Sequence, residues 1–161
     1  MADDSRESVD SRPVDGIAPR QEPSRQDELR AWAAEPYHRY MGVEVQEQHD
    51  GYCRVVIRPG AHTPRGAGNG VHGGILASLA DVSALGAIRS VVGPDDIMSG
   101  TAELNISYLR PAVGELVVTE ARVLKKGRSL VGVDVDISDG KGRLFCKARI
   151  LYALRQRGGA G

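Results

Sequence analysis

The chain has 161 residues, and its 21 Lys and Arg residues balance its 21 Asp and Glu residues. We therefore expect no binding to nucleic acid or to a membrane surface, because no net charge attracts the chain to either. No stretch approaches 18 apolar residues and no apolar segment opens the chain, so we expect neither a spanning helix nor a signal peptide. Cys53 and Cys146 lie in strand-like runs without metal-ligand spacing, which indicates reduced thiols and a cytoplasmic protein.

The composition changes along the chain. Residues 1–30 contain eight acidic residues, five Arg and three Pro, whereas the following 131 residues contain 19 of the 20 glycines. So polar a stretch buries too little apolar surface to offset the entropy of ordering it. We expect residues 1–26 to form a disordered tail, residues 27–155 to form a single domain and residues 156–161 to be a flexible C-terminus.

The first half of the expected domain combines short elements with a glycine-rich loop. Residues 27–34 predict a short helix that ends at Pro36. Weak alternation predicts a strand over residues 42–48, and the β-branched residues within 52–58 predict a stronger one. Residues 59–74 then contain six glycines and two prolines, which is typical of a loop.

The second half consists of one long helix followed by strands. Apolar residues recur at helical spacing over residues 73–92, and Gly93 with Pro94 ends the pattern. Alternating residues then predict four strands, over residues 97–109, 114–124, 129–138 and 142–154. We expect an α+β fold, in which an antiparallel meander of four or five strands packs its apolar face on the helix.

The predicted helix is apolar nearly all round, and within residues 73–88 it carries one charged residue, Asp81. A single sheet covers one side of such a helix, so we expect its other side to meet a second copy of the chain, in a dimer or a dimer of dimers. Because burying an unpaired carboxylate is costly, two interpretations of Asp81 arise. It is either a structural residue that bonds backbone amides or an arginine across an interface, or a general base or nucleophile in a dry cleft; its position favours the second.

Glycines surround the predicted start of this helix, within residues 69–74. The first amides of a helix have no partner within the helix, and they lie at the positive end of its dipole. Glycines there let a ligand oxygen approach the bare N–H groups, which suits an oxyanion or a polarised carbonyl. By themselves, these glycines are better explained by a tight turn that needs positive φ. Residues 68–73 also match G-x-G-x-x-G, but without the flanking parallel strands that a nucleotide site needs.

The long helix, the glycines at its start, Asp81 and the strands that follow together resemble the hotdog-fold acyl-CoA thioesterases. The resemblance is to the branch that contains the phenylacetate-pathway thioesterases and 4-hydroxybenzoyl-CoA thioesterase. The resemblance rests on residues 72–81 (HGGILASLAD), with the acid nine residues after the histidine, and on residues 105–111 (NISYLRP) and 123–130 (VLKKGRSL). It covers residues 41–154 in the same order. It implies the hotdog fold, in which an antiparallel sheet wraps around one long central helix.

By position, the resemblance implies roles for four residues of a catalytic site. Asp81 matches the family's catalytic carboxylate, and the Gly73 N–H group matches the donor to the thioester carbonyl. Thr101 falls where relatives place a Ser or Thr near the attacking water, and His72 matches the family histidine. A helix-capping role explains His72 about as well.

The same comparison suggests residues that bind the substrate. Relatives often carry Asn or Gln six residues before the histidine, where this chain has Gly66, and Asn69 is the nearer amide. Basic residues on a predicted hairpin turn are candidates for binding the phosphates of coenzyme A, although a solvated turn explains this charge equally well. The candidate substrate-binding residues are Asn69, Gly74, Lys125, Lys126, Arg128 and Ser129.

The resemblance implies hydrolysis of a small or medium acyl-CoA, aromatic acyl groups included, to free acid and coenzyme A. A thiol of pKa about 8.5 leaves with little acid help, so the site needs only an N–H donor and a base or nucleophile. We expect an acyl-CoA substrate, a homotetramer, and neither a cofactor nor a metal. Two alternatives stay open: a hotdog hydratase or dehydratase, and a non-catalytic acyl-CoA-binding module.

Overall fold

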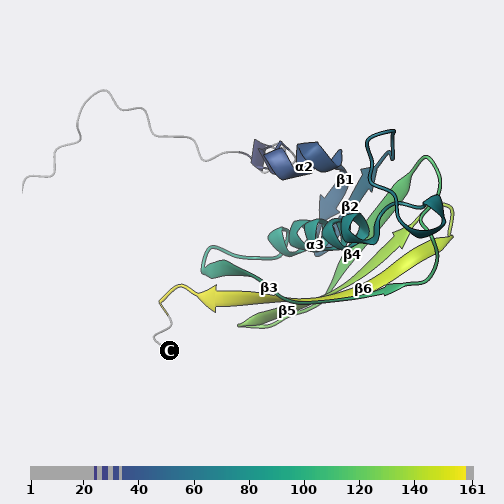
Figure 1. The fold of residues 1–161 in the computed structure, drawn as a ribbon. Helices are drawn as coiled ribbons and strands as arrows, with labels where there is room; N and C mark the ends of the chain where they lie inside the picture. Colours follow the sequence, from purple (N-terminus) through teal and green to yellow (C-terminus); the bar gives the residue numbers. More distant parts are fainter. Residues whose placement is uncertain (1–23, 25–26, 29–30, 33, 159–161) are drawn as a thin grey trace, which may run out of the picture.

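The computed structural model describes residues 24, 27–28, 31–32 and 34–158. Apart from Ser24, the predicted tail over residues 1–26 lies outside the described residues, as do residues 159–161 of the predicted C-terminus. The predicted α+β fold is confirmed: a six-stranded antiparallel sheet packs against one long helix, α3 (Gly73–Arg89), as Figure 1 shows. This is the hotdog arrangement that the resemblance implies.

Two helical segments precede the sheet. Residues 27–28 and 31–32 are helical as predicted, but Pro36 does more than end this segment, because it begins a second helix, α2 (Pro36–Met41). Proline suits the first turn of a helix, where its missing N–H group would have no partner. The Tyr37 hydroxyl of α2 donates to Ser78 Oγ of α3 at 2.7 Å, which joins the two helices. No helix in the described part of the chain is long and apolar enough to cross a membrane.

The strands run in the order β1-β2-β4-β5-β6-β3, and every neighbouring pair is antiparallel. Their bounds are β1 (Glu44–His49), β2 (Tyr52–Ile57), β3 (Asp96–Tyr108), β4 (Val117–Lys126), β5 (Leu130–Ser138) and β6 (Leu144–Gln156). Each strand was predicted, but the sheet has six strands instead of the expected four or five, and the meander predicted after the long helix is correct only in part. Only β4, β5 and β6 form a meander, because β3 lies at the far edge and pairs with β6. Gln156, which the sequence analysis placed in the C-terminal tail, is the last residue of β6.

Strand β5 shows how alternating side chains build the core. The residues on its inner face, Val131, Val133, Val135 and Ile137, are buried. Asp134 lies on the outer face, where its Oδ1 accepts a hydrogen bond from Arg149 Nε at 3.1 Å. The alternation predicted for this strand is therefore confirmed, and the apolar face of the sheet is the one that meets α3.

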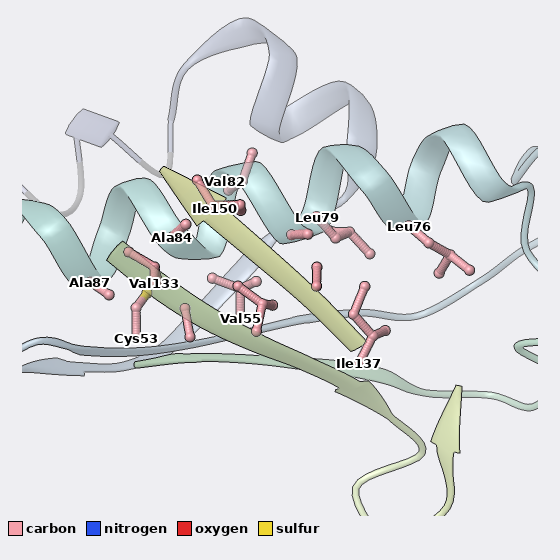
Figure 2. Packing of buried hydrophobic residues seen from close by; sticks show 14 of the residues in the cluster. Cys53, Val55, Leu76, Leu79, Val82, Ala84, Ala87, Val133, Ile137 and Ile150 are labelled. Carbon is pink, nitrogen blue, oxygen red and sulfur yellow. The ribbon is translucent and has the colours of Figure 1, made fainter. Parts of the chain in front are cut away.

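Helix α3 lies along this apolar face. Figure 2 shows Leu76 towards one end of α3, above Ile137, and Ala87 towards the other end, at the level of Val133. Near the second end, Gly86 permits a close approach, because a methyl group there would collide with Cys53 Sγ and would lie 2.9 Å from Trp32 Cη2. Helix α3 is therefore held between the sheet and the helical segment that contains Trp32.

The described residues leave one stripe of α3 at least partly exposed. This exposed stripe consists of Gly74, Ser78, Asp81, Leu85 and Arg89. These residues follow one another at intervals of three and four, so they share one face of the helix. The expected burial of α3 on most sides is thus met within one chain, except along the stripe that carries its acid and at Gly73, Ile75 and Ala77, which are also partly exposed.

Candidate active site

The start of α3 is capped by His72. The His72 Nδ1 accepts a hydrogen bond from the Gly74 N–H group at 3.0 Å, and the His72 carbonyl accepts from Ile75 and Leu76. None of the described residues accepts a hydrogen bond from the Gly73 N–H group. Of the candidate backbone donors, Gly74 is therefore already engaged, and Gly73 retains an N–H group at the positive end of the helix dipole.

Tyr108, at the end of β3, packs directly against this free amide position. Its hydroxyl donates to the Gly73 carbonyl at 3.0 Å, and a methyl group on Gly73 would lie 3.2 Å from Tyr108 Cε1. The sequence analysis included Tyr108 in the matching segment but assigned it no role. Its position at the end of a predicted strand gave no sign of this contact, which depends on how β3 packs beside α3.

A groove of about 320 Å³ opens beside Gly73. Its walls include Tyr108, Arg110 and Pro111 from the end of β3 and the following loop, together with Leu76 of α3. Arg110 is exposed and forms no ion pair with the described residues, so it offers a free positive charge at the groove. The sequence analysis did not single out this residue either.

The loop before α3 is closely packed at the position of the missing amide side chain. Gly66 packs against His72, where a methyl group would lie 3.3 Å from the His72 Cα. Asn69 is exposed in the left-handed region, with φ of 56°, and its side chain forms no hydrogen bond with the described residues. Asn69 therefore shares the loop with the Gly73 amide without contacting it.

Asp81 and Thr101 are brought together from different elements. Thr101, on β3, donates its hydroxyl to Asp81 Oδ1 at 2.6 Å. Asp81 is partly exposed on the stripe defined above and pairs with no cation among the described residues. Within the described chain, this carboxylate therefore bonds neither a backbone amide nor an arginine, and its hydrogen-bond partner is the Thr101 hydroxyl.

Gly73 and Asp81 do not face one common point. They are eight residues apart on the same helix, so their separation along the axis is about 12 Å at 1.5 Å per residue. A reacting carbonyl carbon must lie about 3–3.5 Å from its attacking group and close to its oxyanion donor. The Gly73 N–H group and the Asp81 carboxylate of one chain therefore cannot act on the same thioester.

The basic hairpin, which is the turn between β4 and β5 that carries Lys125, Lys126 and Arg128, lies at the other end of α3 from Gly73. Lys126 Nζ lies 2.8 Å from Asp96 Oδ2. Hydrogen bonds from Lys126, from the Gly93 N–H group and from Gln156 lower the pKa of Asp96 to about 2. Lys126 is thus engaged within the chain, while Lys125 and Arg128 are exposed and form no ion pair with the described residues.

Ser129 is exposed on the hairpin, whereas the two cysteines are buried. The Ser129 carbonyl accepts from the Leu154 N–H group at 2.8 Å, which closes the β4–β5 hairpin onto β6. Cys53 and Cys146 are free and buried, and burial raises their thiol pKa values to about 12 and about 11. No group of three or more His, Cys, Asp or Glu side chains within the described ranges could hold a metal ion.

Comparison with known proteins agrees with this fold. The family model described as the thioesterase superfamily matches residues 68–146. A Saccharolobus solfataricus protein provisionally named esterase SSO1253 is 33% identical over 110 residues, which cover 68% of this chain and 71% of that protein. The medium/long-chain acyl-CoA thioesterase YigI of Escherichia coli is 24% identical over 135 residues, covering 74% of this chain and 85% of YigI.

A solved structure extends the likeness to the whole fold. The conserved protein PA5202 of Pseudomonas aeruginosa superposes with a TM-score of 0.70 at 30% identity, covering 82% of this chain and 99% of that one. The glycine-rich start of α3 and Asp81 fall within the residues that the family model matches. The chain therefore belongs to the thioesterase superfamily.

Proposed function

We propose that the protein is an acyl-CoA thioesterase, which hydrolyses a small or medium acyl-CoA, aromatic acyl groups included, to free acid and coenzyme A. Its membership of the superfamily and its similarity to a relative named as an acyl-CoA thioesterase support this activity. The signature from His72 to Asp81 further supports the phenylacetate-pathway and 4-hydroxybenzoyl-CoA branch.

The observation that carries the proposal is the environment of the Asp81 carboxylate. This carboxylate lies on a largely apolar helix, is partly exposed, and accepts a hydrogen bond from Thr101 instead of pairing with a cation of the described chain. Structural carboxylates at such positions are normally paired, because an unpaired one is costly. A carboxylate that is held but not neutralised is suited to act as a base or a nucleophile.

The separation of Gly73 and Asp81 supports a site shared between two copies. If the α3 helices of two copies lie antiparallel with Ala77 at their crossing point, Gly73 of each copy lies beside Asp81 of the other. Gly74, Ala77 and Ser78, near this crossing, have small side chains that allow helices to approach closely. We therefore propose a homodimer with two composite sites, and a tetramer formed from two such dimers.

In a composite site, each residue has a distinct part in the reaction. The Gly73 N–H group of one copy polarises the thioester carbonyl, aided by the dipole of α3. Asp81 of the other copy either activates a water molecule or attacks the carbonyl to form an anhydride, and Thr101 orients its carboxylate. The thiolate of coenzyme A then leaves without an acid, since its pKa is about 8.5.

The same antiparallel arrangement gives the basic residues a role. It brings the β4–β5 hairpin of one copy, at the end of its α3, towards the start of α3 in the other copy. Lys125 and Arg128 of that hairpin, together with Arg110 of the groove beside Gly73, then supply free cations for the phosphates of coenzyme A. Lys126, which pairs with Asp96, contributes less.

The activity is tested by release of free thiol from a panel of acyl-CoAs, followed with a thiol reagent. We expect thiol release for at least one small or medium acyl-CoA, and this release requires Asp81. A change in enoyl absorbance without thiol release would instead identify a hydratase or dehydratase. Binding of acyl-CoA with neither signal would identify a binding module.

The shared site is tested at the proposed crossing point. Ala77→Arg places a long charged side chain between the helices, so we expect it to yield folded monomers without thioesterase activity, measured by analytical ultracentrifugation and circular dichroism. Leu124→Arg, an equally drastic change at an exposed position on β4, is the matched control and should leave assembly of the dimer intact. A wild-type protein that is monomeric and active at micromolar concentration would overturn the shared site.

A further inference from the structure

The outer face of the sheet, which points away from α3, carries apolar side chains where β5 and β6 pair. Leu130 is 45% exposed, and Leu151 and Ala153 beside it are partly exposed. Together with Gly132 they form one outer apolar patch, because Leu130 pairs with Ala153 and Gly132 pairs with Leu151. A sheet whose outer face meets water normally has polar residues there, so apolar residues on both faces indicate a sheet that is covered on both sides.

Gly132 in this patch has no explanation within its own chain. Glycine weakens a strand, and it often marks a bulge or a place where another backbone or a ligand approaches closely. The bulge of this region lies at Leu124 on the neighbouring strand β4, and the φ of Gly132 is not positive. A methyl group on Gly132 would make only an ordinary contact, 3.9 Å from Leu151 Cδ2. The missing side chain therefore leaves room above the sheet for something outside the chain.

The outward-facing residues of β5 complement those of β6 in size or in charge. The four pairs are Leu130 with Ala153, Gly132 with Leu151, Asp134 with Arg149, and Asp136 with Lys147. A twofold axis that runs along the strands, between β5 and β6, would place β5 of one copy over β6 of another. Each residue would then face, in the other copy, the same kind of residue that it pairs with in its own chain. Large would face small, and acid would face base.

We propose that this outer face packs against the same face of a second copy of the chain, with Leu151 of each copy in the space above Gly132 of the other. Leu130 lies over Ala153 of the other copy in the same way, and the acidic and basic residues form a polar rim. Sheets that pack face to face lie about 10 Å apart with their strands nearly aligned, which this twofold axis provides. The inference does not depend on the proposed thioesterase activity.

This sheet contact joins two of the proposed dimers into a tetramer. The exposed stripe of α3 faces the β3 edge of the sheet, since Asp81 accepts a hydrogen bond from Thr101 on β3. Two copies joined along this stripe have their sheets side by side, with both outer faces on the same side. Two dimers then meet through two sheet contacts, whereas two single chains would meet through one. We expect the sheet contact to hold dimers together but not single chains.

Gly132→Leu tests the contact while leaving the fold of each chain intact. The new side chain has open space in its own chain, but it fills the space that Leu151 of the other copy needs. Overpacking lowers an association constant about five- to hundred-fold at each such site, and the tetramer contains four of them. In analytical ultracentrifugation at micromolar concentration, we expect tetramers for the wild type and dimers for the variant, with an unchanged circular dichroism spectrum. A dimeric wild type or a tetrameric variant would overturn the proposal.

Two further variants separate this contact from a general effect of a larger side chain. Gly60→Leu is the matched control, because Gly60 is exposed after β2 and an added methyl group there meets no atom within 4 Å. It should stay tetrameric. Adding Leu151→Ala to Gly132→Leu places a small side chain opposite the new leucine and should restore tetramers. Loss of tetramers in the control, or a double variant that stays dimeric, would contradict the contact.

The outcome is independent of the activity assay. Thiol release by a protein without tetramers would refute the sheet contact alone. Tetramers that Gly132→Leu disrupts, in a protein that releases no thiol from any acyl-CoA, would support the contact and refute only the proposed thioesterase.

Discussion

Replacing Asp81 by Asn separates a catalytic carboxylate from a structural one. Asn is nearly isosteric and keeps an oxygen that can accept the Thr101 hydroxyl, the contact that holds this side chain at 2.6 Å. The variant therefore loses the charge and the basic or nucleophilic oxygen but retains the local geometry. Its effect on activity and its effect on folding stability should differ greatly.

The expected loss of activity is large. General acid–base catalysis contributes about 10²–10⁴ in rate, equivalent to about 3–5 kcal/mol of transition-state stabilisation. The loss should fall mainly on kcat, because Asp81 acts on the reacting carbonyl and does not hold coenzyme A. A hydrogen bond to a charged group is worth about 1 kcal/mol more than a neutral one. Because Asp81 is partly exposed, the cost in stability should stay below that, and Tm should fall by less than about 5 °C.

Thiol release and thermal unfolding, measured on the same preparations, distinguish a catalytic Asp81 from a structural one. Glu103→Gln is the matched control, since it makes the same chemical change at an exposed position on β3, two residues from Thr101. It should keep both wild-type activity and wild-type Tm. Loss of a base should leave about a hundredth of kcat or less. If Asp81→Asn retained more than about a tenth of kcat, Asp81 would not be the base or nucleophile. Preserved kcat with a collapsed Tm would identify a structural ion.

Three further predictions concern the fold. Cys53 and Cys146, with pKa values of about 12 and about 11, should not react with a thiol reagent at pH 8 until the protein is unfolded, so they will not contribute to the thiol-release assay. The pKa of Asp96 falls from 3.8 to about 2 on folding, so Asp96 stabilises the fold above pH 4 and this contribution is lost as the pH falls towards 2. Asp96→Asn should therefore flatten the decline of stability with acid, measured by urea unfolding at each pH. Gly86→Ala should cost about 1–3 kcal/mol in urea unfolding, because its methyl group collides with Cys53 Sγ; no loss would mean that the packing there is loose.

The sequence by itself determined the local features of the protein. The apolar repeat that ends at Gly93 and Pro94 predicted α3, and the alternation of Val131 to Ile137 predicted the buried face of β5. These features depend on spacing within one element, where the periods of 3.6 and 2 residues are read directly. The single acid of α3 drew attention to Asp81 for the same reason.

The tertiary structure alone decided which elements meet. The pairing of β3 with β6, instead of its neighbour in sequence, brings Thr101 to Asp81 and Tyr108 to Gly73. No local pattern specifies such contacts, because the packing of distant segments determines them and many pairings satisfy the same alternation. The hairpin residue Lys126 likewise looked free in the sequence, yet the fold places Asp96 beside it, so its charge is already paired.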